Sequence, residues 1–364
     1  MSRGAMESAA TSVENSQDPR HVFRSDTRWG RSVMEWPSLK AFLATAEVQS
    51  GVHSVPIGEF AGKKVNYDFL VTARPGTVLL CHFHANTPTP RNNDLPLFTG
   101  LGVTDSITTS MFIPSDPALA LDPNLGLAWH FGCEGIHLQT ITVSIVKKLQ
   151  TILHAPRVVT WGGSGGGFAA IRVAKDIPNS IALAWNPQTD IAKYNRDSVN
   201  SYRRVAFPTI VADSPLPSGR EQFPSLCTDE FVDGYQGRIL YLQESTDWHV
   251  GAHLKPFLAS FSRKALCDIT VSSNFSGVVT DRLYLHLGHW GNGHVPPSKE
   301  VLSKVLSLLS EVTPNVENLE TWKGFPWDVL KFIVSNLSQQ VPATKIGEQI
   351  GSDLRSNSST NDSP

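Results

Sequence analysis

The residues best suited to chemistry in this chain form the pattern Gly162-Gly163-Ser164-Gly165-Gly166. The segment 157–161 before it predicts a buried strand, and the segment 168–174 after it predicts a helix. A serine on so sharp a strand-to-helix turn projects its hydroxyl above the sheet edge, and glycines leave room where backbone and helix crowd it. The helix N-terminus beneath the turn favours developing negative charge. The pattern therefore predicts Ser164 as a nucleophile.

Two other glycine-rich motifs fit this segment less well. A phosphate-binding loop needs a lysine after its glycines, and none follows here. A dinucleotide-binding fingerprint starting at Gly163 would meet Phe168 at its last glycine position. A glycine-rich turn without chemistry remains the alternative to a nucleophilic serine.

A serine hydroxyl reacts only when a base takes its proton, and histidine oriented by a carboxylate does this near neutral pH. After such a serine turn, the acid and then the histidine follow along the chain. Asp247 lies just after a predicted strand at 238–243, and His294 lies in the loop after a predicted strand at 282–287. Both fall at carboxyl ends of strands, where ligands bind in open α/β sheets.

Other residues compete for these two roles. His289 is the alternative base, and Asp190 and Glu244 are alternative acids. Asp190 also fits a helix N-cap, because Ile191-Ala192-Lys193 follows it, and Asp247 could cap the next helix in the same way.

A tetrahedral intermediate needs two N–H donors for its oxyanion. The backbone N–H of Gly165, next after the serine, is the first candidate. The second should come from the loop after an earlier strand, where Ala85 stands in Phe83-His84-Ala85-Asn86.

Histidines raise the separate possibility of a metal site. His82 and His84 lie close together, and His249 and His253 are spaced i, i+4. The chain has no His-Glu-x-x-His motif and no cysteine pair. We therefore expect neither a metal nor another cofactor.

Composition narrows the function classes. The chain has 364 residues and a net charge of −2, with no basic cluster that would indicate nucleic-acid binding. No apolar run is long enough to span a bilayer, and no secretory signal is visible at the N-terminus. The four scattered cysteines fit free thiols in a reducing compartment, so we expect a cytoplasmic location.

The chain is predicted to hold one domain at 21–346, between polar tails at 1–20 and 347–364. The proline-rich part of 192–236 fits a cap or insertion beside the site. Strands alternate with helices, which predicts an α/β fold with a mostly parallel central sheet and helices on both faces. The expected strands are 53–58, 65–71, 77–83, 157–161, 180–185, 238–243 and 282–287, and the expected helices are 138–154, 168–174, 253–263 and 298–312.

Four motifs together resemble a known family. They are the serine turn at 162–170, Asn186-Pro187-Gln188-Thr189-Asp190-Ile191, Asp247-Trp248-His249 and Gly293-His294-Val295-Pro296-Pro297. In this order they resemble bacterial α/β-hydrolase-like proteins associated with glycan and surface-polysaccharide systems, including the hydrolase-like part of an accessory secretion component implicated in glycan O-acetylation. The resemblance covers roughly 55–309. It implies an α/β-hydrolase fold and a site at Ser164, Asp247 and His294, with a structural role for Asp190.

The function expected from these residues is a serine-dependent, esterase-like hydrolase that works through an acyl-enzyme on a small-molecule or glycan ester. A glycan O-acyltransferase with the same triad shares the first half-reaction and is the first alternative. A non-catalytic scaffold of hydrolase fold is the second. Neither the substrate nor the oligomeric state follows from the sequence.

Overall fold

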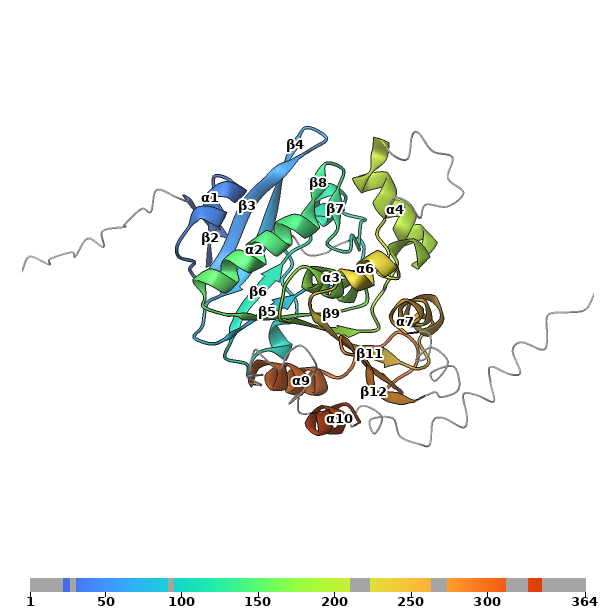
Figure 1. Cartoon of the computed structure of the whole chain (residues 1–364). Coiled ribbons are helices and arrows are strands. Elements are labelled where there is room, and N and C mark those ends of the chain that lie inside the picture. The colour runs from blue at the N-terminus through green and yellow to red at the C-terminus, as the bar shows by residue number, and fades with distance from the viewer. Residues whose placement is uncertain are drawn as a thin grey trace, which may run out of the picture.

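The computed structural model describes residues 22–26, 31–90, 95–209, 223–262, 274–311 and 327–335. Its centre is one large twisted sheet (Figure 1) with the strand order β1-β2-β3-β4-β6-β5-β9-β10-β11-β13-β12. Neighbours from β6 to β13 in this order run parallel, whereas β4 is antiparallel to both β3 and β6, and β12 is antiparallel to β13. Parallel neighbours need crossover connections, which the helices supply.

The bounds of the elements are as follows. The strands are β1 (Val22–Asp26), β2 (Arg31–Glu35), β3 (Gly51–Phe60), β4 (Lys63–Thr72), β5 (Val78–His82), β6 (Ser110–Pro114), β7 (Gly132–Cys133), β8 (Ile136–His137), β9 (Arg157–Gly163), β10 (Ser180–Trp185), β11 (Arg238–Glu244), β12 (Phe275–Thr280) and β13 (Leu283–Gly288). The α-helices are α1 (Leu39–Ala44), α2 (Leu138–Ile152), α3 (Ser164–Lys175), α4 (Arg196–Ala206), α6 (Asp229–Asp233), α7 (Lys255–Phe261), α9 (Lys299–Glu311) and α10 (Trp327–Ser335). Short helical turns are η1 (Leu101–Val103), η2 (Pro117–Leu121), η3 (Ile191–Lys193) and the π-helical η4 (Val250–Leu254).

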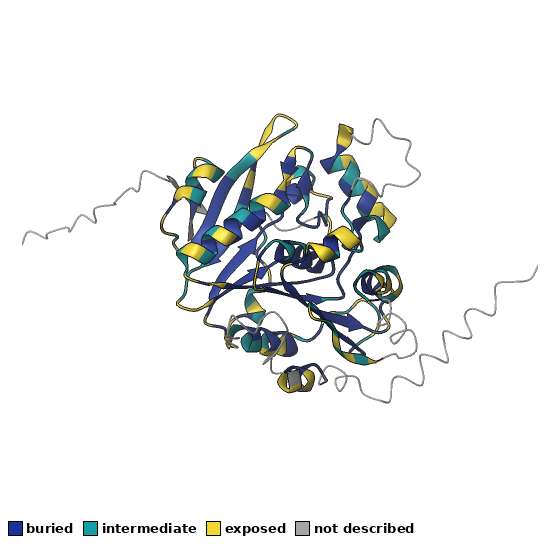
Figure 2. Cartoon of the chain, viewed as in Figure 1, coloured by how far each residue is buried: buried dark blue, intermediate teal, exposed yellow. Residues whose placement is uncertain are grey.

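Apolar residues on both faces of the sheet explain why helices cover each side. Val158 in β9 packs into the core under α1, α2 and α3, whereas Val159 packs into the core under α9 and α10. This alternation follows from the two-residue period of a strand. The central strands β9 and β11 are therefore buried along their whole length, and β10 as far as Ala184 (Figure 2), as in parallel sheets covered on both faces.

The fold is that of an α/β-hydrolase, as the sequence predicted, and it follows from the mostly parallel sheet with the serine turn between β9 and α3. The predicted strand 180–185 is β10, and the predicted antiparallel pair 53–58 and 65–71 lies within β3 and β4. The helix expected at 253–263 differs in its start, because the π-helical turn η4 precedes α7. Strands β1, β2, β6, β7, β8 and β12 were not predicted.

Several other predictions can be compared with the described residues only in part. The predicted tails at 1–20 and 347–364 lie outside the described residues. The segment 192–236 contains α4 and α6 in its described parts. Cys81, Cys133 and Cys227 are free thiols, and Cys267 lies outside the described residues. No helix among the described residues has the length and apolar character needed to cross a bilayer.

Candidate active site

Ser164 sits at the turn from β9 into α3 with a left-handed backbone, φ +52°. A residue with a Cβ rarely adopts this conformation, and strain of this kind concentrates at functional sites. A Cβ on Gly166 would lie 2.1 Å from the Phe83 carbonyl oxygen, and one on Gly162 would lie 2.7 Å from it. The glycines therefore let the loop after β5 pack closely against the serine turn.

A cavity of about 490 Å³ opens beside Ser164. Its volume lies within the roughly 300–1,000 Å³ of small-molecule sites. His294, Ala85 and Asn186 line it together with the serine. Rings of His82, Trp161 and Trp185 form an aromatic wall, with centroid separations of 3.9 Å and 6.1 Å along that order.

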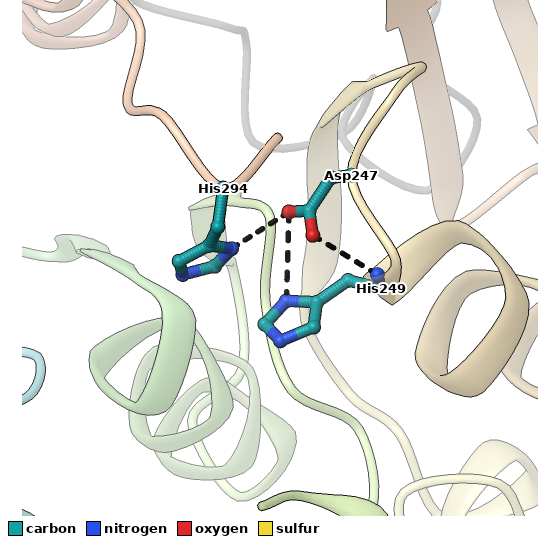
Figure 3. Close-up of side chains that lie close together, drawn as sticks. All are labelled: Asp247, His249 and His294. Carbon is teal, nitrogen blue, oxygen red and sulfur yellow. Dashed lines mark hydrogen bonds and ion pairs between the residues drawn. The ribbon is translucent and has the colours of Figure 1, made fainter. Parts of the chain in front are cut away.

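One hydrogen bond joins the candidate acid Asp247 to the candidate base His294 (Figure 3). His294 Nδ1 lies 2.7 Å from Asp247 Oδ2, and the other carboxylate oxygen accepts the backbone N–H of His249 at 3.0 Å. Burial by itself raises the pKa of Asp247, but these two hydrogen bonds and the electrostatic attraction to His249 and His294 together outweigh it and hold the pKa below its ordinary value. Asp247 is therefore ionised near neutral pH and can only accept, so Nδ1 of His294 carries a proton, and in the neutral imidazole Nε2 keeps its lone pair.

The serine hydroxyl has a different partner in this state. Ser164 Oγ accepts a hydrogen bond from Gln188 Nε2 at 2.9 Å, and among the described residues no hydrogen bond joins it to His294. In free enzymes, catalytic hydrogen bonds are often long and tighten only with substrate bound. Ser164 and His294 share the cavity, which leaves the reacting group of a substrate access to both.

The alternative residues lie in other positions. His289 Nδ1 binds the buried carboxylate of Glu244 at 2.8 Å, and His289 is not among the described residues that line the cavity. Glu244 also accepts the backbone N–H groups of Trp290 and Gly291. Asp190 caps the η3 turn by accepting from the Ala192 N–H at 3.0 Å, as its predicted N-cap role requires.

The two oxyanion candidates flank the serine. Gly165 is the second residue of α3, and a Cβ there would lie 2.6 Å from Leu127 Cδ1, so a larger residue would require the Leu127 side chain to shift. Ala85 lines the cavity, and its carbonyl accepts a hydrogen bond from His84 Nδ1 at 2.9 Å. The His84 ring in turn accepts the Asp116 backbone N–H, which fixes the loop after β5.

Asp247, His249 and His294 bring potential metal ligands within 4.8 Å of one another. In this arrangement His294 Nδ1 donates to Asp247, and His249 Nδ1 donates to the Asn186 carbonyl at 2.9 Å. Both nitrogens therefore carry protons and have no lone pair for a metal. Burial lowers the pKa of His249 to about 4, so its ring is neutral near pH 7. Asp247, His249 and His294 are thus joined in one hydrogen-bond network.

Sequence analysis singled out the segment after β10 as a motif but assigned no role to Asn186 or Gln188. The Asn186 side chain bridges the loops, accepting the Glu244 N–H at 2.8 Å and donating to the Val295 carbonyl at 2.7 Å. Gln188 contacts the serine directly. The available signal was the polar run Asn-Pro-Gln-Thr-Asp directly after a buried strand, but its contact with Ser164 depends on β10 pairing with β9.

No protein-family model matches this chain, and no curated protein sequence matches it. Solved structures resemble it weakly. The glycosylation-associated Gap123 complex of Streptococcus agalactiae is 11% identical with a TM-score of 0.46, over 72% of this chain and 47% of that chain. Pyrococcus horikoshii acylaminoacyl peptidase is 11% identical with a TM-score of 0.45, over 75% and 44% of the two chains. Carboxyl esterase 2 of Tuber melanosporum is 12% identical with a TM-score of 0.41, over 82% and 88%.

This chain spans less than half the length of the first two of these proteins. At this level of identity, likeness concerns the fold and carries no conclusion about activity. The function must therefore be argued from the residues of the site.

Proposed function

We propose that this protein is a serine-dependent hydrolase of esters. The observation that carries the proposal is the strained Ser164 facing the same cavity as His294, whose Nδ1 is held at 2.7 Å by Asp247. A base with a free Nε2, an oriented ring and a serine on a sharp turn are the parts that acyl transfer to a hydroxyl needs.

The reaction runs in two halves. Ser164 Oγ attacks the acyl carbon while its proton passes to His294 Nε2, and the carbonyl oxygen becomes an oxyanion held by the N–H groups of Gly165 and Ala85. The C–O bond to the alcohol breaks as His294 returns the proton to the leaving oxygen. Water then attacks the acyl-enzyme with His294 again as base, releasing the acid and restoring Ser164. Asp247 stays ionised and stabilises the imidazolium in both halves.

The cavity indicates an uncharged substrate with an apolar or aromatic portion. Among the described lining residues none is Asp, Glu, Lys or Arg, and burial lowers the pKa of His82 to about 3, so the aromatic wall is neutral near pH 7. Tyr194, from the segment 192–236, also lines the cavity, which supports a rim role for that segment. Transfer of the acyl group to a sugar hydroxyl uses the same first half-reaction and differs in what accepts the acyl group.

Turnover of p-nitrophenyl esters by wild type and Ser164→Ala tests the proposal. We expect measurable kcat/KM in wild type and a loss of at least about 10³-fold in the variant. Ser180→Ala is a matched control, because this buried hydroxyl bonds Ala174 and Ile177 carbonyls at the other end of β10. Activity that survives in Ser164→Ala, or no turnover by folded wild type across short and long acyl chains, would reject a serine esterase.

A further inference from the structure

The side chain of Gln188 contacts the atom that the proposed reaction uses. It is fully buried after β10, and its Nε2 lies 2.9 Å from Ser164 Oγ. Its backbone N–H donates to the Ser164 carbonyl at 3.1 Å as well. Two hydrogen bonds thus join Gln188 to Ser164, one to its backbone and one to its hydroxyl.

Trp129 fixes which end of the Gln188 amide faces the serine. The indole Nε1–H of Trp129 donates to Gln188 Oε1. An indole nitrogen can only donate, so the oxygen of the amide must face Trp129 and the NH₂ group must face Ser164. Trp129 is itself held with 1% exposure between the rings of Tyr194 and Tyr202, at centroid distances of 5.9 Å and 5.4 Å.

The orientation of the amide constrains the serine proton. A hydroxyl has one donor and two acceptor positions, and an amide NH₂ has no acceptor. Because Ser164 Oγ accepts from Gln188, its own proton must point to another group. His294 faces the same cavity and has a free Nε2.

We propose that Gln188 is a further catalytic residue, which donates a hydrogen bond to Ser164 Oγ, directs the hydroxyl proton toward His294 and stabilises the oxygen as that proton leaves. The inference rests on the proposed function. Gln188 exchanges no proton in this role. The Ser164 proton goes to His294 Nε2, and the freed electron pair of Oγ forms the bond to the acyl carbon. Trp129 acts through Gln188 and is a positioning residue.

Gln188→Glu tests the direction of this hydrogen bond, because it keeps the shape and exchanges the donor for a carboxylate that only accepts. The ionised carboxylate would take the serine proton away from His294, whereas the protonated acid could still donate. Burial raises the pKa of such a carboxyl. We therefore expect Gln188→Glu to show a new fall in activity toward alkaline pH that wild type lacks, and at least about 10²-fold slower labelling by a fluorophosphonate above that fall.

Two further variants separate this role from a purely structural one. Trp129→Phe frees the amide to turn and should slow labelling about tenfold, and Gln188→Met removes the donor and should slow it by ~10-fold to 10²-fold without a new alkaline limb. Gln139→Glu is the matched control, since Gln139 on α2 donates to the Arg172 carbonyl away from the cavity. Thermal unfolding shows which variants fold. If Gln188→Glu does not fold, the labelling rates of Trp129→Phe and Gln188→Met test the role of Gln188.

The outcomes are distinguishable. If wild type is not labelled at Ser164, the proposed function fails. If wild type is labelled and folded Gln188→Glu keeps both its rate and its pH profile, the role of Gln188 is overturned while the serine hydrolase stands. Equal slowing in Gln139→Glu would also overturn it, because the loss would then not depend on contact with Ser164.

Discussion

His294 and Asp247 form one hydrogen-bonded pair at 2.7 Å, and His289 and Glu244 form another at 2.8 Å. Both carboxylates are buried, and each binds the Nδ1 of its histidine. They differ in their other partners. Glu244 also accepts backbone N–H groups of Trp290 and Gly291, so it anchors the loop, whereas His294 lines the cavity with Ser164.

The two pairs show that a histidine bound to a buried carboxylate is not by itself a sign of catalysis. The same bond can hold a loop or orient a base. Access to the cavity and to the nucleophile separates the two roles. The His289–Glu244 pair fixes the loop from which His294 extends, and so it supports the position of the His294–Asp247 pair.

The two histidines should differ strongly in their effect on activity. His294→Asn should lower kcat/KM for a p-nitrophenyl ester by at least about 10³-fold, because it removes the proposed base for the serine proton. His289→Asn should lower it by less than about tenfold. Steady-state kinetics of both variants measure this, with thermal unfolding to establish that each is folded. Equal losses in the two variants would contradict the division of roles.

Replacing the two carboxylates should affect different properties: activity for Asp247 and stability for Glu244. Asp247→Asn leaves the geometry but favours the wrong histidine tautomer, so we expect a fall in kcat of about 10⁴-fold with little change in stability. Glu244→Gln places an NH₂ group among the N–H donors of Trp290, Gly291 and Thr246, and leaving one buried donor unpaired costs about 1–3 kcal/mol of unfolding free energy. Urea denaturation and kinetics on the same samples test both. A stability loss confined to Asp247→Asn would reverse the assignment.

Two buried, neutral histidines near Asp247 should make the stability of the protein depend on pH. Burial lowers the pKa of His249 to about 4 and that of His253 to about 3, from 6.5. Below pH 6.5 the unfolded chain therefore binds more protons than the folded chain. The free energy of unfolding falls as the pH drops from 6.5 toward these pKa values, by up to about 1.4 kcal/mol per pH unit for each histidine. His253→Asn keeps an acceptor for the Thr189 N–H and should reduce this slope. Urea denaturation at pH 7, 6 and 5 measures it, and an unchanged slope would contradict the neutral state of His253.

Thr246 links the two pairs, and its expected effect is the smallest. Its hydroxyl donates to Glu244 at 3.0 Å and accepts the Gly293 N–H at 2.9 Å, next to His294. Thr246→Val should cost about 1 kcal/mol of stability and lower kcat only a few-fold, because His294 keeps its bond to Asp247. Ser245→Ala, which removes only a 3.5 Å contact with Glu244, is the control. A fall in kcat as large as that of His294→Asn would show that Thr246 does more than link the loops.

Sequence patterns predicted the serine turn, the strands beside it and the α/β-hydrolase fold, because glycine spacing and strand periodicity are local properties. They also placed Asp247 and His294 at the carboxyl ends of strands. They favoured His294 and kept His289 as the alternative base, since both lie in one loop and the choice depends on which ring reaches the cavity. Gln188 was missed because its contact arises from strand pairing across the sheet.

The nucleophilic role of Ser164 is the claim on which the account depends. Peptide mapping by mass spectrometry after reaction with a fluorophosphonate tests it most directly, because the adduct marks the atom that attacked. The account predicts one adduct, on the peptide that contains Ser164, and none after denaturation of the protein before reaction. An adduct on another residue, or none on folded protein that still turns over esters, would contradict it.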